Sequence, residues 1–232
     1  MLREATTDLA MLDRLVKPAG KDIVDVGCGG GALVRALAER GARPIGLEIS
    51  AEQLAPALAH DEENRARYVV GRAQELPFAD GSFDGVVFMR ALHHVPAADL
   101  PRAVTEARRV LRPGGMVYVV EPLAEGSYFE LLSLVEDERE VRAAAQRALE
   151  DSGAFDLERV TTVEYEVRFR IADLGVLRAR AVSVDPARAE VFEAREAELR
   201  EAFTRLGEAD EDRGGRWFLQ PMRADVLLAG GA

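Results

Sequence analysis

Between Lys21 and Pro122 the sequence alternates short apolar runs with segments of helical periodicity. The apolar runs predict five strands, at residues 22–26, 43–49, 66–71, 83–90 and 116–122. The segments between them predict helices at residues 31–41, 50–60 and 98–115. Because the strands are continuously apolar, both of their faces should be covered, and strand–helix repetition of this kind is typical of a parallel, doubly wound sheet.

The pattern changes after Pro122. Further helices are predicted at residues 127–153 and 185–207, an alternating antiparallel strand at 157–171, and a closing strand at 216–230. The two added strands bring the total to seven, so we expect an α/β fold with a doubly wound, mostly parallel seven-stranded sheet. In such sheets ligands bind outside the carboxyl ends of the strands, at the switch point beside the first strand.

Composition narrows the classes of partner. The formal net charge is −11 and no block of Lys and Arg is present, which argues against a nucleic-acid partner. The N-terminal segment lacks the apolar core of a signal peptide, and no apolar run approaches the roughly 18–20 residues that span a bilayer. We expect a cytoplasmic protein without integral membrane association.

Cys28 is the only cysteine, so no disulfide and no cysteine metal cluster is expected, and we expect no metal site.

A glycine-rich loop joins the first strand to the first helix of this core, with the sequence Asp25-Val26-Gly27-Cys28-Gly29-Gly30-Gly31. Glycines permit positive φ angles and let a ligand approach the main chain, and the following helix offers unpaired N–H groups. Glu48 follows about 20 residues later at the end of the second strand, where a carboxylate can accept both hydroxyls of a ribose. The loop therefore predicts a cofactor that contains a nucleoside.

Two cofactors compete for this loop. Gly27 to Ala32 satisfies the dinucleotide pattern G-x-G-x-x-[GA], which is weak when it stands alone. The spacing Asp25-x-Gly27-x-Gly29-x-Gly31 resembles the first motif of class I S-adenosylmethionine-dependent methyltransferases. A carboxylate before the loop is unfavourable for a pyrophosphate, whereas it suits the ammonium of a methionyl group.

The resemblance extends over about a hundred residues. Residues 71–96 and 107–122 are similar to the corresponding stretches of small-molecule methyltransferases of the ubiquinone/menaquinone-biosynthesis type. This resemblance implies a Rossmann-like methyltransferase fold, with S-adenosyl-L-methionine as cofactor and S-adenosyl-L-homocysteine as product. It implies roles for nine residues: Asp25, Arg90 and Ala91 near the methionyl group, Gly27, Gly29 and Gly31 lining the cofactor, Glu48 at the ribose, and Ala73 and Gln74 beside the adenine.

One position departs from the family. Members often read "GDAE" where this chain reads "GRAQ", so Arg72 replaces the aspartate that commonly accepts the adenine amino group. Either Gln74 takes over this contact, or the adenine is bound more weakly or in a different arrangement.

Candidate catalytic residues follow the fourth and fifth strands. His93 and His94 lie at the carboxyl end of the fourth strand, where one of them could remove a proton from the acceptor or the pair could close the loop by hydrogen bonds. Tyr128, just after the fifth strand, could orient an acceptor, and Glu121 at that strand's end is similarly placed.

We therefore expect an N-terminal helix within residues 1–20, a cofactor-binding core at 21–122, and a part at 123–232 that completes the sheet and supplies helical cap insertions over a substrate. The predicted activity is transfer of a methyl group to oxygen, nitrogen or carbon of a small organic acceptor by in-line displacement.

Several acceptor classes are disfavoured. The chain lacks the Asn/Asp-Pro-Pro-aromatic motif of base amino-methylation, a cysteine placed to attack pyrimidines, and acidic residues for a catechol-type magnesium site. Two alternatives of other classes remain: a non-catalytic module that binds S-adenosylmethionine or a protein, and an NAD(P)-dependent reductase, for which no Tyr-x-x-x-Lys pair is present.

Overall fold

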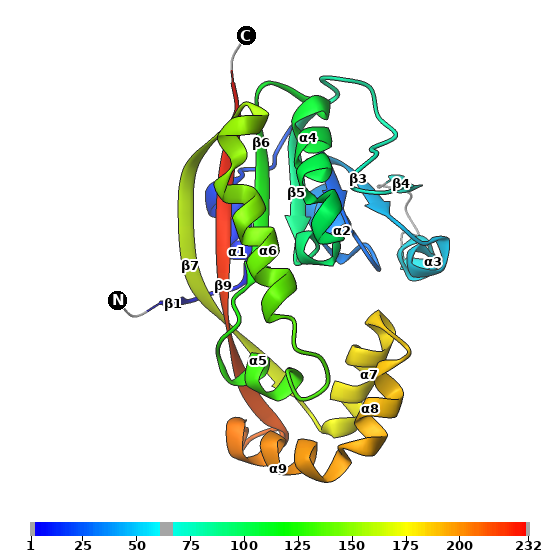
Figure 1. The fold of residues 1–232 in the computed structure, drawn as a ribbon, viewed down its shortest axis with the longest axis vertical. Coiled ribbons are helices and arrows are strands. Elements are labelled where there is room, and N and C mark those ends of the chain that lie inside the picture. Colours follow the sequence, from blue (N-terminus) through cyan, green and yellow to red (C-terminus); the bar gives the residue numbers. More distant parts are fainter. Residues whose placement is uncertain (1–2, 61–66, 231–232) are drawn as a thin grey trace. The chain divides into compact units, whose positions relative to one another are not determined.

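The computed structural model describes residues 3–60 and 67–230, so residue 66 of the expected third strand lies outside the described residues. The strands form one sheet with the order β1-β7-β9-β6-β5-β2-β3-β4, and β8 pairs with β9 (Figure 1). The strands are β1 (Glu4–Ala5), β2 (Asp22–Val26), β3 (Arg43–Glu48), β4 (Arg67–Val70), β5 (Phe83–Met89), β6 (Leu111–Pro122), β7 (Leu157–Ile171), β8 (Glu208–Ala209) and β9 (Arg216–Ala229).

The doubly wound sheet predicted from the sequence is confirmed. Strand β2 pairs in parallel with both β3 and β5, β3 pairs in parallel with β4, and β5 pairs in parallel with β6. Strands β1 and β8 have two residues each, and the other seven of the nine strands correspond to the seven expected ones. From β2 the chain first adds β3 and β4 on one side of β2 and then β5 and β6 on the other side. The position between β2 and β5 is therefore the switch point of the sheet.

Helices connect and follow these strands. The α-helices are α1 (Asp8–Leu15), α2 (Ala32–Glu39), α3 (Ala51–His60), α4 (Leu100–Val110), α5 (Ser127–Leu132), α6 (Arg139–Glu150), α7 (Leu174–Val184), α8 (Arg188–Ala194) and α9 (Glu196–Leu206). Short 3₁₀ helices within the described residues are η1 (Leu92–His94), η2 (Ala97–Asp99) and η3 (Ser152–Phe155). The expected N-cap of α3 is present, since the Ser50 hydroxyl accepts the N–H groups of Glu52 and Gln53 at 3.2 and 3.4 Å.

Two expected helices are each divided. The segment 127–153 contains α5, α6 and η3, and Asp137 Oδ1 accepts the Arg139 N–H at 3.1 Å where α6 begins. The segment 185–207 contains α8 and α9, because Arg195 leaves the helical conformation with φ −117° between them. The prediction of one continuous helix was wrong in both places.

Two further boundaries differ from the sequence expectation. The helix expected over residues 98–115 ends at Val110, and β6 begins at Leu111, which pairs with Phe83 through a register shift before the regular ladder. Helix α7 was not predicted at all. It starts at the N-cap Asp173, whose carboxylate accepts the Val176 N–H at 2.9 Å.

The chain forms two compact units. We call Asp8–Glu121, Ala143–Val163 and Arg223–Ala232 the core unit, and Met1–Thr7, Pro122–Arg142 and Glu164–Met222 the helical unit. The core unit holds the five parallel strands and α1 to α4, with residues 143–150 of α6. The helical unit holds α5, α7, α8 and α9.

Each unit has its own apolar core. In the core unit the buried face of α4, with Ala103, Val104 and Ala107, packs with Val86 and Phe88 of β5 and with further residues of β2 and β6. In the helical unit the core gathers residues from α5, α7, α8, α9 and the adjoining strands: Leu131, Ile171, Leu177, Ala181, Phe192, Leu199, Ala202 and Phe218. The candidate site lies at the carboxyl edge of the parallel strands of the core unit.

Candidate functional site

The register of the parallel strands brings distant segments together at one edge of the core unit. Val26 at the end of β2 pairs with Leu47, Glu48 at the end of β3 pairs with Val70, and Met89 at the end of β5 pairs with Val120. The residues that follow these strands therefore emerge at the same carboxyl edge. They include most of the residues that the sequence nominated.

A cavity of about 190 Å³ lies at this edge. Its lining is apolar over much of its surface, with five polar side chains among the apolar ones. It is formed by Val26, Gly27, Leu47, Glu48, Ile49, Gly71, Arg72, Ala73, Gln74, Phe88, Ala91, His94, Val95, Pro96 and Asp99. Five of the nine nominated cofactor residues line it, namely Gly27, Glu48, Ala73, Gln74 and Ala91. Asp25, Gly29, Gly31 and Arg90 do not line it.

The glycine loop is held by contacts that a side chain would disrupt. Gly27 has φ +79°, and a Cβ there would lie 2.6 Å from the Cβ of Ala91, so these two nominated residues are in contact. Gly31 caps α2 with φ +71°, where a Cβ would approach the ring of Tyr68 to 2.9 Å. Gly29, at φ +49°, faces open space. Two of the three glycines are therefore required by packing, and the third leaves room beside the main chain.

Glu48 joins the glycine loop to β3. Its Oε2 accepts the N–H of Gly29 at 2.9 Å and its Oε1 accepts the N–H of Ile49 at 2.7 Å. The side chain is 7% exposed, and its carboxylate is fixed at the wall of the cavity. Each carboxylate oxygen can accept a second hydrogen bond, so this arrangement leaves capacity for two hydroxyl groups of a ligand.

Asp25 is the most deeply buried acid of the loop. It is 1% exposed, and its Oδ1 has no hydrogen-bond partner among the described residues. Burial, and secondarily the negative charge of Glu48, raise the pKa of Asp25 to about 7. A buried carboxylate oxygen that accepts no hydrogen bond is costly, and a cationic ligand group would relieve this cost.

Arg90 occupies the turn after β5 in a strained conformation. Its φ is +57°, which is unusual for a residue with a side chain, and its N–H donates to the Val120 carbonyl at 2.7 Å. Its guanidinium forms an ion pair with Asp8 of α1. The main chain at Arg90 and Ala91 is thus anchored on two sides where the sequence expected the methionyl group, although that role remains a prediction.

The two histidines of η1 differ in environment. His93 is 5% exposed, and its Nδ1 is hydrogen-bonded to Oε2 of Glu121, a residue that is 2% exposed. The other oxygen of Glu121 accepts the Leu92 N–H at 2.8 Å. His94 is exposed and lines the cavity, and the centroids of the two imidazole rings lie 4.0 Å apart.

Tyr128 belongs to the helical unit. Its ring packs against Phe169, with centroids 4.8 Å apart, and lies 6.5 Å from that of Phe218. It therefore contributes to the aromatic core of that unit, and its expected role toward an acceptor stays a prediction.

Asp99 is a cavity residue that sequence reasoning missed. It lies at the end of η2, and its Oδ2 accepts a hydrogen bond from the Gln74 side-chain amide at 3.3 Å. Arg72 lines the same cavity. The only sequence signal for Asp99 was an acid at the start of a predicted helix, which normally indicates an N-cap.

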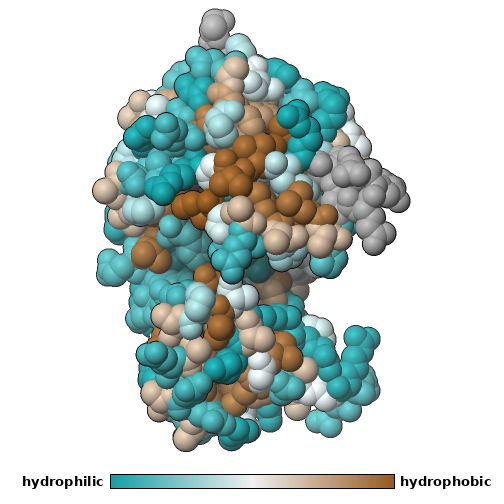
Figure 2. Space-filling view, turned by 90° about the vertical axis from the view of Figure 1, so that its right-hand side faces the viewer, coloured by the Kyte–Doolittle hydropathy of each residue, from teal (hydrophilic) through white to brown (hydrophobic). Residues whose placement is uncertain are grey.

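These features fit the nucleoside cofactor that the sequence indicated. Glu48 provides acceptors for hydroxyl groups, the apolar walls suit the faces of a flat base, and Asp25 has an oxygen without a hydrogen bond that suits a cation. Ile49 next to Glu48 is 56% exposed although it is apolar, and Leu58 and Val70 of α3 and β4 are also exposed. Figure 2 shows hydrophobic surface on the side of the molecule that carries these two elements in Figure 1.

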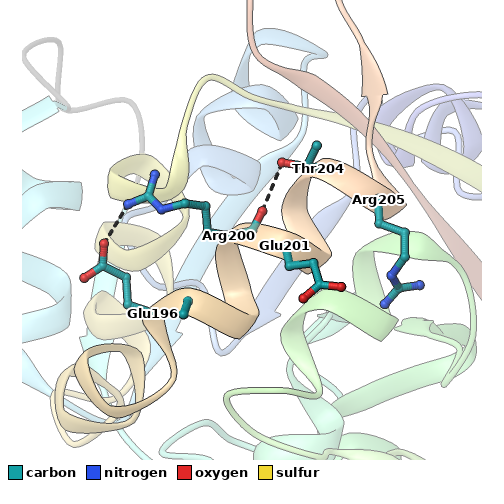
Figure 3. Close-up of a pocket in the computed structure, with 6 residues that line it drawn as sticks. Glu196, Arg200, Glu201, Thr204 and Arg205 are labelled. Carbon is teal, nitrogen blue, oxygen red and sulfur yellow. Dashed lines mark hydrogen bonds and ion pairs between the residues drawn. The ribbon is translucent and has the colours of Figure 1, made fainter.

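Three other features of the described residues were considered as sites: a hollow on α9, the Cys28 thiol and possible metal ligands. None of them combines a cavity with buried polar groups as the carboxyl edge does. A hollow of about 760 Å³ is lined by residues of α9 alone, where Glu196 pairs with Arg200 at 2.6 Å (Figure 3). Burial raises the pKa of the Cys28 thiol, which makes it a poor nucleophile. Within residues 3–60 and 67–230 no group of three or more potential ligands is arranged for a metal ion, and no helix could cross a membrane.

Part of this chain is similar to known methyltransferases. Residues 24–119 match the family model described as a methyltransferase domain. The ubiquinone biosynthesis O-methyltransferase of Chromobacterium violaceum is 37% identical over 116 residues, which are 47% of this chain and 48% of that protein. The chain spans about half the length of the curated relatives it matches. The expected resemblance to class I S-adenosylmethionine-dependent methyltransferases is confirmed.

Solved structures share the fold. A candidate methyltransferase of Bacillus halodurans superposes with a TM-score of 0.67 at 21% identity, over 97% of this chain and 100% of that one. The cyclase SpnF superposes with a TM-score of 0.64 at 21% identity, over 96% of this chain and 79% of that one. At these identities the similarity establishes the fold alone.

Proposed function

We propose that this chain, which carries a methyltransferase domain at residues 24–119, transfers a methyl group from S-adenosylmethionine to a small organic acceptor. The observation that carries the proposal is the cavity at the carboxyl edge of the parallel strands. Its wall includes a fixed carboxylate, Glu48, and Gly27. The buried Asp25, whose Oδ1 accepts no hydrogen bond from the described residues, precedes Gly27 in the same loop. An acidic and apolar site suits a cationic nucleoside better than a pyrophosphate.

S-adenosylmethionine supplies an electrophilic methyl group whose leaving group is a neutral thioether. Glu48 would hold the ribose hydroxyls, while Asp25 and the main chain of Arg90 and Ala91 would hold the amino-acid part. These residues therefore contribute alignment and exclusion of water, which are the main demands of an in-line displacement.

Of the two histidines, His94 lines the cavity, whereas the ring of His93 is held by a carboxylate. Because the Glu121 carboxylate only accepts hydrogen bonds, the neutral imidazole must present its Nδ1–H to Glu121, and its lone pair is then on Nε2. We propose that this Nε2 takes the proton of the acceptor hydroxyl as the oxygen–carbon bond forms. Glu121 would act as a positioning residue through its bonds to His93 and the Leu92 N–H.

A hydroxyl acceptor is the first class to test. Such a group must lose a proton on methylation, which gives the histidine–glutamate pair a function. The relatives named ubiquinone biosynthesis O-methyltransferases methylate oxygen according to their name, and they match 47% of this chain. The proposal also includes acceptors that are methylated on nitrogen or carbon.

A non-catalytic binding module is the second candidate. Arg72 at the adenine side of the cavity motivates it, because this position departs from the family pattern. The shared fold does not separate the two possibilities, since one structure with the same fold carries the name of a cyclase. Turnover of a methyl acceptor separates them directly.

Calorimetric titration with S-adenosylmethionine, S-adenosylhomocysteine and NADPH, side by side, tests the cofactor. We expect micromolar dissociation constants for the first two ligands and no binding of NADPH. Binding of NADPH alone, or of none of the three, would contradict the proposal.

A screen of phenolic, amine and carbon acceptors then tests the activity by release of S-adenosylhomocysteine. We expect turnover with a hydroxyl-bearing acceptor. Tight cofactor binding without turnover on any class would favour the binding module.

A further inference from the structure

The polar corner of the cavity that contains Asp99 has the chemistry needed to recognise an adenine amino group. This inference rests on the proposed function, because it assigns the base contact of the same cofactor site. Arg72, Gln74 and Asp99 all line the cavity. An exocyclic amino group donates hydrogen bonds, so its partner must accept, and the Arg72 guanidinium has no acceptor.

Asp99 is not used for helix capping. It occupies the N-cap position of α4, yet its side chain makes no cap hydrogen bond. The residue two positions into the helix is Pro101, which has no N–H to offer to a capping carboxylate. The Asp99 main chain is fixed by its N–H, which donates to the Pro96 carbonyl at 2.8 Å. The carboxylate is therefore presented to the cavity from a rigid turn.

Gln74 orients this carboxylate. The Gln74 side-chain amide donates to Oδ2 of Asp99 at 3.3 Å, and no hydrogen bond to Oδ1 occurs within the described residues. Because a carboxylate only accepts, Gln74 must turn its NH₂ group toward Asp99. One oxygen of Asp99 is thus engaged and the other retains its full capacity to accept a hydrogen bond.

We propose that the Asp99 carboxylate, positioned by Gln74, accepts the hydrogen bond of the cofactor's adenine amino group. This assignment resolves the departure at Arg72, because the acceptor comes from the turn before α4 and not from the segment after β4. Gln74 then acts through Asp99 and does not itself replace the missing aspartate. The same geometry disfavours a base with an oxo group at that position, which would meet a carboxylate with another acceptor.

The test exchanges the donor and acceptor on both sides of the contact. Calorimetry measures the affinities of S-adenosylhomocysteine and of S-inosylhomocysteine, in which an oxo group replaces the amino group. Wild-type protein should prefer the adenine compound at least tenfold. In Asp99→Asn the side chain can donate to the oxo group, so we expect weaker S-adenosylhomocysteine binding, tighter S-inosylhomocysteine binding and at least a tenfold fall in the preference. Glu75→Gln, which neutralises an exposed acid next to Gln74, is the matched control and should keep the wild-type preference.

The outcomes are distinguishable from failure of the proposed function. If wild-type protein binds neither compound, the cofactor assignment itself is wrong. If it binds S-adenosylhomocysteine but does not discriminate against the inosine compound, or if Asp99→Asn keeps the wild-type preference, the role of Asp99 is overturned. Thermal unfolding of the variant should match the wild type, because the Asp99 side chain caps no helix. The wild-type comparison tests the proposal even where the variant is unstable.

Discussion

The candidate site in the core unit and the helical unit differ in how their buried charges are paired. In the core unit Asp25, Glu48 and Glu121 are buried, and none of them pairs with a Lys or Arg among the described residues. In the helical unit the buried Arg142 is fully engaged, with Glu138 at 2.7 Å and the Leu123 carbonyl at 3.0 Å. Buried carboxylates without a Lys or Arg partner are costly and are often found at functional sites, whereas breaking a buried ion pair by removing one partner destabilises the fold.

This contrast divides the molecule by task. At the candidate site we propose that Glu48 and Asp25 receive hydroxyls and a cation of a ligand, while Glu121 holds His93. In the helical unit, acids form ion pairs with arginines of the same unit, as Glu136 and Glu138 do with Arg188. Variants of the first set should therefore change binding and turnover, and variants of the second set should change stability.

The largest effect is expected for Glu121→Gln. The glutamine oxygen can still accept the Leu92 N–H, but its NH₂ group would then face His93 Nδ1 and force the proton onto Nε2. With the base removed, turnover of a hydroxyl acceptor should fall by about 10²–10⁴ while the affinity for S-adenosylhomocysteine is unchanged. The residual rate should rise with pH as the acceptor ionises by itself.

Glu138→Gln is the comparison in the helical unit. It removes the charged partner of Arg142, so thermal stability should fall while turnover is retained. Equal turnover in Glu121→Gln and wild type would show that His93 does not act as a base. A loss of turnover in Glu138→Gln at a temperature where it is folded would break the division between the units.

Glu48→Ala should weaken binding of S-adenosylmethionine and S-adenosylhomocysteine at least tenfold. The variant loses charge-assisted bonds to a ribose, and it also frees the N–H groups of Gly29 and Ile49 that fix the loop. Calorimetry measures both dissociation constants, with Glu52→Ala on the exposed face of α3 as control. An unchanged dissociation constant would refute the placement of the ribose.

Much of the core unit was predictable from the sequence. Continuous apolar strands in alternation with helices leave few topologies, and a parallel sheet must bring the strand ends at Gly27, Glu48 and Arg90 to one edge. The positive φ angles at Gly27, Gly29 and Gly31 agree with the reason given for these glycines. The residues at this edge could be predicted from local sequence because short strands and short turns allow few positions for the residues that follow each strand.

The remaining features depend on contacts that sequence patterns do not contain. Asp99 has the sequence context of a helix N-cap, and only the structure shows that its carboxylate does not cap. Helix α7 was missed because its apolar residues are spread around the helix and do not form a single stripe. The break at Arg195 is stabilised by bonds of its guanidinium to the Leu134 carbonyl and to Glu198, and the first of these partners is distant in sequence.

Asp25→Asn should weaken the binding of S-adenosylmethionine and increase the stability of the folded protein. The folded-state pKa of Asp25 is raised to about 7, so wild-type protein loses stability as the pH rises from the unfolded-state value of about 3.9 toward 7. The neutral asparagine does not suffer this loss. The variant should therefore be more stable than wild type by about 1–3 kcal/mol at pH 8, and the difference should shrink as the pH falls toward 4.

Ligand binding sharpens the test of Asp25. A cation placed against this carboxyl group would lower its pKa, so wild-type protein should release protons when it binds S-adenosylmethionine between pH 6 and 7. Titration in buffers of different ionisation enthalpy measures the release. In Asp25→Asn the release should vanish and the affinity should fall several-fold. A wild-type protein without proton release would show that the cation lies elsewhere.

The smallest effect is expected for Tyr128→Phe in the helical unit. The ring that packs against Phe169 and Phe218 is preserved, so the unfolding midpoint should stay within a few degrees of wild type. If the hydroxyl orients the acceptor, KM for that acceptor should rise by roughly two- to fivefold with no change in cofactor affinity, as expected for the loss of one neutral hydrogen bond. Steady-state kinetics at saturating S-adenosylmethionine measures this. An unchanged KM would show that the Tyr128 hydroxyl does not orient the acceptor, and acceptor recognition would then have to be sought in other residues.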